Sequence, residues 1–190
     1  MRTVSRWAAA FVCVVVCAGA GAASAEDLTL HFAPADTKVE FTLGDVLHTV
    51  HGTFQLKRGE FRFAADTGKA SGELVVDAAS GASGSAARDR RMTTEILESA
   101  RFPEIVFRPG RLDGKVAAEG HSQVEIHGEF IIHGAAHEMS IPAEVDASAG
   151  VYTTTLRFTV PYQKWGMKNP SMLLLRVSDK VEITVQAVGR

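Results

Sequence analysis

The chain has 190 residues, of which 46% are hydrophobic and 22% are charged, and its formal net charge is −2. Its 20 basic residues are outnumbered by 22 acidic ones and form no basic stripe, which argues against nucleic acid as a partner. The length suits one domain with a hydrophobic core and is too short for two comfortable domains.

Residues 1–25 have the pattern of a secretory signal peptide. Arg2 and Arg6 precede an apolar run from Trp7 to Ala20, and Ala23-Ser24-Ala25 follows as a small-x-small cleavage site. The run is shorter than the roughly 20 residues that span a bilayer. We therefore expect cleavage after Ala25, export to the periplasm, and a mature domain over residues 26–190 that is not inserted in the membrane.

Both cysteines, Cys13 and Cys17, lie inside the predicted signal peptide. The mature chain is therefore expected to have neither a disulfide framework nor a cysteine nucleophile.

The first half of the mature chain alternates apolar and polar residues over short stretches, as in β-strands. Thr37–Leu43 and Lys69–Asp77 are two such stretches. Between them a hairpin is predicted, with its turn at Lys57–Glu60 around Gly59. The side chains expected to point inward here include Val39, Phe41, Phe54, Phe61, Phe63, Leu74 and Val76.

The stretch from Ser80 to Phe107 predicts a loop, the one substantial helix and a short strand. Asp89 is positioned to cap a helix over residues 89–100, and Pro103 is expected to end it. A strand over 104–107, with Ile105 and Phe107 on one face, then runs to a Pro109-Gly110 turn. The apolar face of the helix comprises Met92, Ile96, Leu97 and Ala100.

The last third of the chain predicts a second hairpin, with strands over 122–133 and 139–145 joined by a turn at Gly134–Ala136. Strands over Val151–Val160 and 181–187 follow. Inward positions on these strands include Ile126, Phe130, Ile132, Leu156 and Phe158. The insertion between the last two strands is apolar for a loop and carries Trp165, Gly166, Met167, Met172 and Leu173.

About eight strands joined largely by hairpins favour an all-β fold, an eight-stranded antiparallel barrel with one short helix. A barrel of this size has room inside either for side chains alone or for one slender ligand. The pattern leaves both readings open.

Four segments in order carry a family resemblance. They are His51-Gly52-Thr53-Phe54, Arg88-Asp89 with 102–107, Gly128–Gly134, and Tyr162–Gly166 followed by Val177–Val185. Together they resemble the YceI-like family of bacterial periplasmic proteins that bind polyisoprenoid lipids. The resemblance implies a lipocalin-like barrel that binds a polyprenyl or quinone-type tail in an apolar tunnel and performs no covalent chemistry.

On this resemblance the tunnel lining is expected to comprise Val39, Phe41, Phe54, Phe61, Phe63, Leu74, Val76, Ile105, Phe107, Ile126, Phe130, Ile132, Leu156, Phe158 and Trp165. The Trp165–Leu173 insertion is expected at the entrance. Arg88, Asp89 and Pro103 are expected to be structural. An alternative places Arg88, with Arg90 or Arg91, at the tunnel mouth to meet a lipid phosphate.

Two rival functions remain open. A filled barrel could act as a protein-interaction or inhibitor module through its outer surface. A metal-dependent enzyme could use the histidines, with His48, His51, His121 and His127 as candidates to converge. However, GxGxxG, Walker A and GxSxG motifs are absent. His133 and His137 are four residues apart, but Gly134 between them argues against a helix, and the run His137-Glu138-Met139-Ser140-Ile141 lacks the second histidine of a zinc-protease motif. We expect no catalytic residue, metal or cofactor, and homodimer formation stays open.

Overall fold

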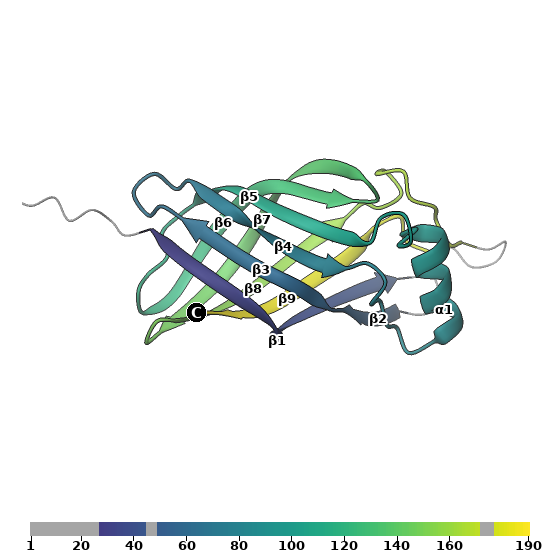
Figure 1. Ribbon diagram of the computed structural model, residues 1–190, viewed down its shortest axis with the longest axis horizontal. Helices are drawn as coiled ribbons and strands as arrows, with labels where there is room; N and C mark the ends of the chain where they lie inside the picture. The colour runs from purple at the N-terminus through teal and green to yellow at the C-terminus, as the bar shows by residue number, and fades with distance from the viewer. Residues whose placement is uncertain (1–26, 45–48, 172–176) are drawn as a thin grey trace, which may run out of the picture.

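The computed structural model describes residues 27–44, 49–171 and 177–190 (Figure 1). The predicted signal peptide lies outside these ranges, as do His48, Met172 and Leu173. The described elements are β1 (Leu28–Gly44), β2 (Thr49–Phe54), β3 (Leu56–Phe63), β4 (Ala70–Asp77), α1 (Ala86–Arg91), the π-helical turn η1 (Met92–Ile96), β5 (Glu104–Asp113), β6 (Gly120–Ile132), β7 (Ala135–Ser148), β8 (Val151–Val160) and β9 (Val181–Gly189).

The strands form one closed antiparallel sheet. From β3 to β9 each strand pairs with the next, and β1 closes the circle by pairing with β9. The first half of β1 pairs with β3 and its second half with β2. Only Gln55 separates β2 from β3, so the two are halves of one bent strand and the barrel has eight walls. The predicted eight-stranded antiparallel barrel is confirmed.

The predicted turn at Lys57–Glu60 is wrong, because these residues continue straight through β3. Gly59 lies opposite Phe32 on β1 and Leu74 on β4. A Cβ atom at Gly59 would lie 3.0 Å from the Cβ atom of Phe32. This glycine therefore marks a close approach between strands and not a reversal of the chain.

The predicted helix is shifted toward the N-terminus. α1 begins after Ser85, and the helical unit ends with η1 at Ile96, well before Pro103. Glu98 takes a left-handed conformation, with φ of 47°, which ends the helix without help from the proline. Asp89 does not cap the helix, since its carboxylate accepts hydrogen bonds from Ser83 in the preceding loop.

The predicted Pro109-Gly110 turn is also wrong, because β5 continues to Asp113. The register of β5 against β6 shifts between Pro109 and Arg111, so Gly110 occupies a bulge. A bulge tolerates a proline, which has no amide hydrogen to donate to the ladder.

The β6–β7 hairpin is confirmed, with its turn one residue earlier than predicted. His133 and Gly134 connect the strands and both have positive φ, 52° and 77°. Two successive residues with positive φ give the turn whose twist matches that of a two-stranded hairpin. A Cβ atom at Gly134 would also lie 2.4 Å from the ring of Phe102. Glycine is therefore favoured here both by the positive φ and by the lack of space for a side chain.

The interior of the barrel differs between its two ends. The half farther from α1 is packed with buried side chains, which we call the packed cluster. A smaller cluster lies beside α1 and the loop after β8, and contains Leu97, Phe130, Ile132, Val160, Tyr162 and Met167. The packed cluster comprises Leu30, Phe32, Leu56, Phe61, Phe63, Ala70, Leu112, Val124, Ile126, Ala143, Val145, Ala147, Tyr152 and Ala187.

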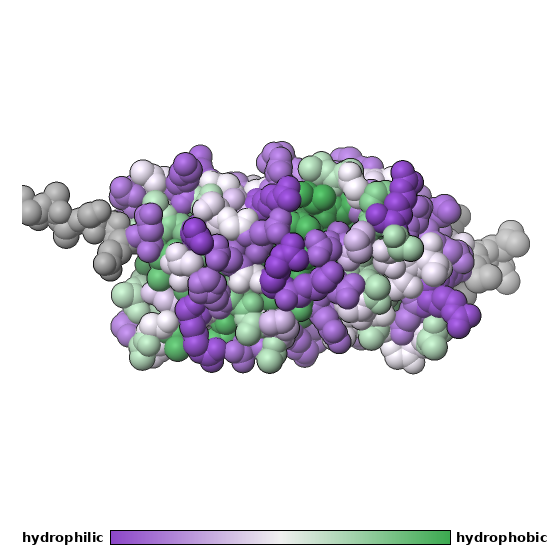
Figure 2. All heavy atoms as spheres, in the orientation of Figure 1, coloured by the Kyte–Doolittle hydropathy of each residue, from purple (hydrophilic) through white to green (hydrophobic). Residues whose placement is uncertain are grey.

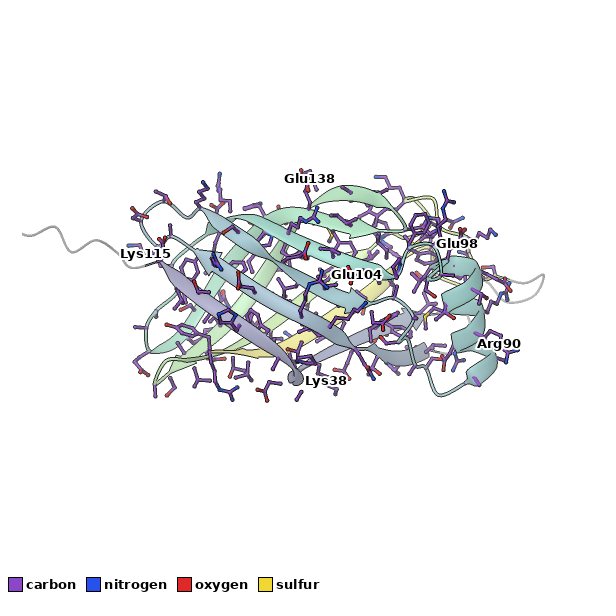
Figure 3. The ribbon with its side chains drawn as sticks, viewed as in Figure 1. Lys38, Arg90, Glu98, Glu104, Lys115 and Glu138 are labelled. Atoms are coloured by element: carbon purple, nitrogen blue, oxygen red, sulfur yellow. The ribbon has the colours of Figure 1, made fainter. Side chains whose placement is uncertain are left out.

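The outer surface is mainly hydrophilic over β3, β4 and β5 (Figure 2). Val106 of β5 and Val75 of β4, which lie opposite each other, are exceptions. Val75 points outward and is nevertheless fully buried. Around it Arg58 donates to Glu73 and Glu104, and Arg108 donates to Glu73 (Figure 3 labels Glu104). The aliphatic stems of these arginines shield the valine from water while their charged ends stay solvated.

Candidate ligand-binding site

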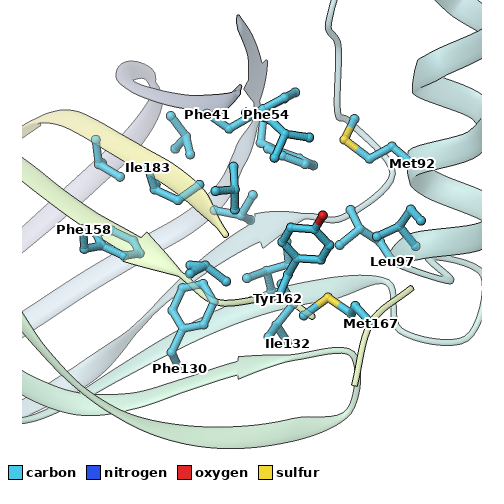
Figure 4. A pocket seen from close by; sticks show the side chains of 18 of the residues that line it. Phe41, Phe54, Met92, Leu97, Phe130, Ile132, Phe158, Tyr162, Met167 and Ile183 are labelled. Carbon is cyan, nitrogen blue, oxygen red and sulfur yellow. The ribbon is translucent and has the colours of Figure 1, made fainter. Parts of the chain in front are cut away.

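A cavity of about 570 Å³ occupies the half of the barrel next to α1 (Figure 4). Its walls are inward-facing side chains of the strands, and Met92, Ile96 and Leu97 line it from the helical unit. Tyr162 and Met167 line it from the loop after β8. The cavity is therefore bounded by the barrel wall, the helix and this loop.

The structure brings most of the predicted lining residues together around this cavity. Strand alternation places them on one face of each wall, as the sequence indicates. The predicted residues that line the cavity are Val39, Phe41, Phe54, Leu74, Val76, Ile105, Phe107, Phe130, Ile132, Leu156 and Phe158.

Three predicted lining residues, Phe61, Phe63 and Ile126, belong to the packed cluster instead. They point inward as expected, but at the filled end of the barrel. The rings of Phe61 and Phe63 lie 6.0 Å apart and pack against each other, so they fill the space that they would otherwise line.

Trp165 also lies outside the cavity lining. Its ring stacks on His137 of β7, with centroids 4.0 Å apart and the planes at 4°. It lies 5.9 Å from Phe130, which lines the cavity. Trp165 thus packs the loop after β8 against Phe130 and His137 at this end of the barrel without lining the cavity.

Several lining residues were not among the sequence predictions for the tunnel. Met92, Ile96 and Leu97 were predicted to lie on the apolar face of the helix, but an apolar helix face does not indicate whether it packs on a core or lines a cavity. Other apolar lining residues missed are Leu43, Val50, Leu56, Ile141, Val160, Tyr162, Met167, Pro170, Val177, Val181, Ile183 and Val185. On the strands, the same alternation could have found Leu43 and Ile183.

The helix is held over the cavity by the loop before it. Thr53 of β2 and Ala82 exchange two backbone hydrogen bonds of 2.9 Å, and the amide of Gln55 donates to Ser80 Oγ. Ser83 is held by the motif residues, since Arg88 donates to its hydroxyl and carbonyl oxygens at 2.7 and 2.9 Å. The Arg88-Asp89 pair thus ties the first turn of α1 to this loop.

The loop after β8 is fixed by Tyr162. Its hydroxyl donates a 2.6 Å hydrogen bond to the carbonyl of Ser178, whose own amide donates to the carbonyl of Gly44. Burial, together with the nearby carboxylate of Asp179, raises the pKa of Tyr162 to about 12. The phenol is therefore neutral at physiological pH and holds its hydrogen bond.

The polar part of the described lining is small and carries positive charge. Arg88 and Arg91 contribute the charge and lie at the helical end with Ser85, whereas Thr37 lies at the opposite end, across from Ala187. No acidic side chain lines the described cavity. Arg91 also pairs through Nε with Glu95 at 3.2 Å. Arg90 does not line the cavity and lies on the outer side of α1 (Figure 3).

The histidines are engaged in separate contacts. His121 contacts Asp146 at 2.9 Å, and His51 contacts Thr42 at 3.1 Å. Within the described residues, no three His, Cys, Asp or Glu side chains lie close enough together to bind a metal ion. His133 is half-buried against Phe102, with ring centroids 4.7 Å apart.

One serine, one histidine and one aspartate meet on the outer wall. His127 lies 2.7 Å from Ser140 Oγ through Nδ1 and 2.9 Å from Asp113 through Nε2. Arg111 beside Asp113, and then the hydrogen bond from His127, hold the pKa of that carboxyl below its ordinary value. Because the aspartate is already paired with Arg111, we assign these contacts to joining β5, β6 and β7.

Residues 30–189 match the family model of the YceI-like domain. The chain belongs to the YceI-like family. Comparison with curated proteins gives no match.

Solved structures share the fold of this YceI-like barrel. BcnA of Burkholderia cenocepacia matches with a TM-score of 0.67 and 15% identity, over 83% of this chain and 98% of BcnA. A polyisoprenoid-binding domain of Saccharophagus degradans, implicated in plant cell wall breakdown, matches with a TM-score of 0.65 and 14% identity, over 85% and 97%. The YceI protein of Campylobacter jejuni gives 0.55 and 14%, over 68% and 78%.

In the part of the chain that the structure describes, no helix combines the length and the apolar character that crossing a membrane requires.

Proposed function

We propose that this YceI-like protein is a non-enzymatic binding protein that holds the apolar chain of an isoprenoid lipid inside the barrel. The observation that carries the proposal is the cavity of about 570 Å³, whose lining is almost wholly apolar. Each buried methylene contributes on the order of 0.8 kcal/mol, so a chain binds without directional contacts. The Saccharophagus degradans neighbour, described as polyisoprenoid-binding, supports this ligand class.

The charged residues of the lining suggest how the lipid is oriented. Arg88 and Arg91 lie on the helical unit, at the end of the cavity opposite the packed cluster. A lipid with a polar or anionic head would place the head beside these arginines and its tail in the barrel. The reverse orientation would place the head against apolar side chains, at a desolvation cost.

The proposed location is the periplasm, where the protein would carry or sequester the lipid. The support for this location is the signal-peptide pattern of residues 1–25. A binding protein of this kind shields an apolar chain from water between membranes.

The rival account, a filled barrel that works through its outer surface, predicts an interior without a void. The packed cluster meets that expectation in one half of the barrel only. The other half leaves room for a ligand, which favours the lipid-binding account.

Intrinsic fluorescence gives a direct test. A chain that begins at residue 26 has one tryptophan, Trp165, which lies 5.9 Å from the cavity-lining Phe130. Titration with a prenyl alcohol of four isoprene units should change Trp165 emission saturably at one lipid per chain. The lipid should also stabilise the fold, by about 2.7 kcal/mol at 100 times the Kd.

Two phenylalanine variants of β1 make the test specific. Val39→Phe adds a ring at a lining position and should weaken binding, whereas Lys38→Phe adds the same ring on the exposed face and should not. Absence of a saturable signal, or equal binding by both variants, would contradict the proposed function.

A further inference from the structure

The cavity ends part-way down the barrel, and β9 shows where. Val181, Ile183 and Val185 point inward and line the cavity. The next inward residue, Ala187, belongs to the packed cluster. On β1, Val39 lines the cavity opposite Val185, and Thr37, the last lining residue of this strand, lies opposite Ala187. The floor of the cavity therefore lies beyond Val185, at the level of Thr37 and Ala187.

The floor is made of side chains that face the cavity on one side and the packed cluster on the other. Below them lie buried aromatic residues, among them Phe61 and Phe63. A chain could pass this level only by separating side chains that are already in contact, which is costly in a well-packed core. The floor residues are Leu56, Leu74, Val76, Phe107, Leu156 and Val185.

The volume above this floor limits what can be enclosed. An apolar cavity of about 150 Å³ holds benzene, which corresponds to about 25 Å³ for each carbon. At that density the cavity of about 570 Å³ encloses about 23 carbons. Since an isoprene unit has five carbons, about four whole units fit.

We propose that the protein selects lipids by chain length, with about four isoprene units as the longest chain that it encloses fully. The floor sets the limit, and Val185 and Ile183 are specificity-determining positions along β9. This inference rests on the proposed function, because it assumes that the cavity holds a lipid chain. It adds which members of the ligand class the site accepts.

Extraction from membranes tests the limit. Prenyl alcohols of two, three, four, six and eight isoprene units are placed at equal mole fraction in phosphatidylcholine vesicles. The protein is added, the vesicles are pelleted, and prenol in the supernatant is measured by mass spectrometry. Moving a chain from bilayer to cavity is nearly neutral, but each methylene left in water is penalised. Chains of up to four units should be extracted, and the eight-unit chain at least 100-fold less.

Substitutions at successive inward positions of β9 probe the depth of the cavity, because alternate residues of a strand lie about 6.6 Å apart. Val185→Phe should move the cut-off below four units, and Ile183→Phe, one step nearer the helix, should move it further. Gln186→Phe and Glu182→Phe place the same ring at exposed positions of β9 and should leave the cut-off unchanged.

The outcomes separate this inference from the proposed function. Extraction of the eight-unit chain as efficiently as the four-unit chain would overturn the length limit and leave lipid binding intact. A cut-off that does not move in Val185→Phe and Ile183→Phe would overturn the assignment of the floor. Failure to extract any prenol would instead overturn the proposed function, and the length limit with it.

Discussion

Gly52 shows how one residue fixes the helical end of the cavity. A Cβ atom there would lie 2.4 Å from the ring of Phe41, a lining residue, and 2.5 Å from the carbonyl oxygen of Ala82. Ala82 belongs to the loop that holds α1 in place through its bonds with Thr53. Glycine therefore lets a cavity wall and the helix-bearing loop approach the same backbone position.

Gly52→Ala should destabilise the fold by about 1–3 kcal/mol, because neither the backbone carbonyl nor the ring can easily move away. Urea unfolding measures the change. Gly44→Ala is the matched control, since a Cβ atom at Gly44 meets no atom of the described residues within 4 Å. Equal stability of the two variants would show that the close approach at Gly52 does not constrain the fold.

His137 gives the loop after β8 a dependence on pH. Burial lowers the pKa of His137 below its ordinary value of 6.5, and among the described residues its Nε2 has no hydrogen-bond partner. The unfolded chain therefore takes up a proton near pH 6.5 that the folded chain resists. The stability of the neutral stack on Trp165 is complete above that pH and is lost as the pH falls below it.

Unfolding free energies between about pH 7.5 and pH 5 test this sign. The wild-type chain should lose more stability on acidification than His137→Phe, which keeps an aromatic ring against Trp165 but cannot titrate. Because all other titratable groups are shared, the difference isolates His137. Parallel curves for the two proteins would rule the dependence out.

At the scale of elements, the helical unit and the loop after β8 together close one end of the barrel. Leu97 and Met167 are buried in the same cluster as Phe130 of the wall. The helical unit has only α1 and one π-helical turn, so its position depends on tertiary contacts more than on its own helical stability. The contacts of Ser83 with Arg88 and Asp89 are central to that position.

Ser83→Ala should loosen the helical unit. The variant removes the hydroxyl that accepts from Arg88 Nε and donates to Asp89, at about 1 kcal/mol, while the two bonds from Arg88 and Asp89 to the backbone of residue 83 remain. Amide hydrogen exchange should become faster over 86–97 while β6 and β7 keep their protection. Ser85→Ala is the control, because the Ser85 side chain makes no capping hydrogen bond. Unchanged exchange in Ser83→Ala would show that the contacts of Ser83 with Arg88 and Asp89 do not hold the helical unit in place.

The sequence predicted strands correctly where apolar and polar residues alternated over a long stretch. It failed where a glycine or proline could mark either a turn or an irregularity within a strand. The β6–β7 hairpin follows from regular alternation ended by a turn with glycine at a positive φ. Gly59 and Pro109-Gly110 look like turns by composition, yet they occupy a close strand approach and a bulge. Only the neighbouring strand decides between these meanings, and a single sequence does not identify that neighbour.

At the scale of the whole molecule, the barrel has a packed core at one end and a cavity at the other. Alternation predicts which side chains point inward, and it did so for Phe61 as well as for Phe41. It cannot tell whether an inward side chain meets another or faces a void, because that depends on all the walls at one level. The sequence therefore predicted which side chains point into the barrel, but not at which level along the barrel the cavity lies.

Native mass spectrometry of the untagged protein purified from its native host tests the central claim most directly. Organic extraction then identifies whatever dissociates from the chain. The account predicts one lipid per chain, with isoprene-unit mass spacing and about four units or fewer enclosed in the cavity. Repeated preparations of ligand-free protein that also fails to take up added prenols would contradict it, and would leave the outer surface as the place to look for function.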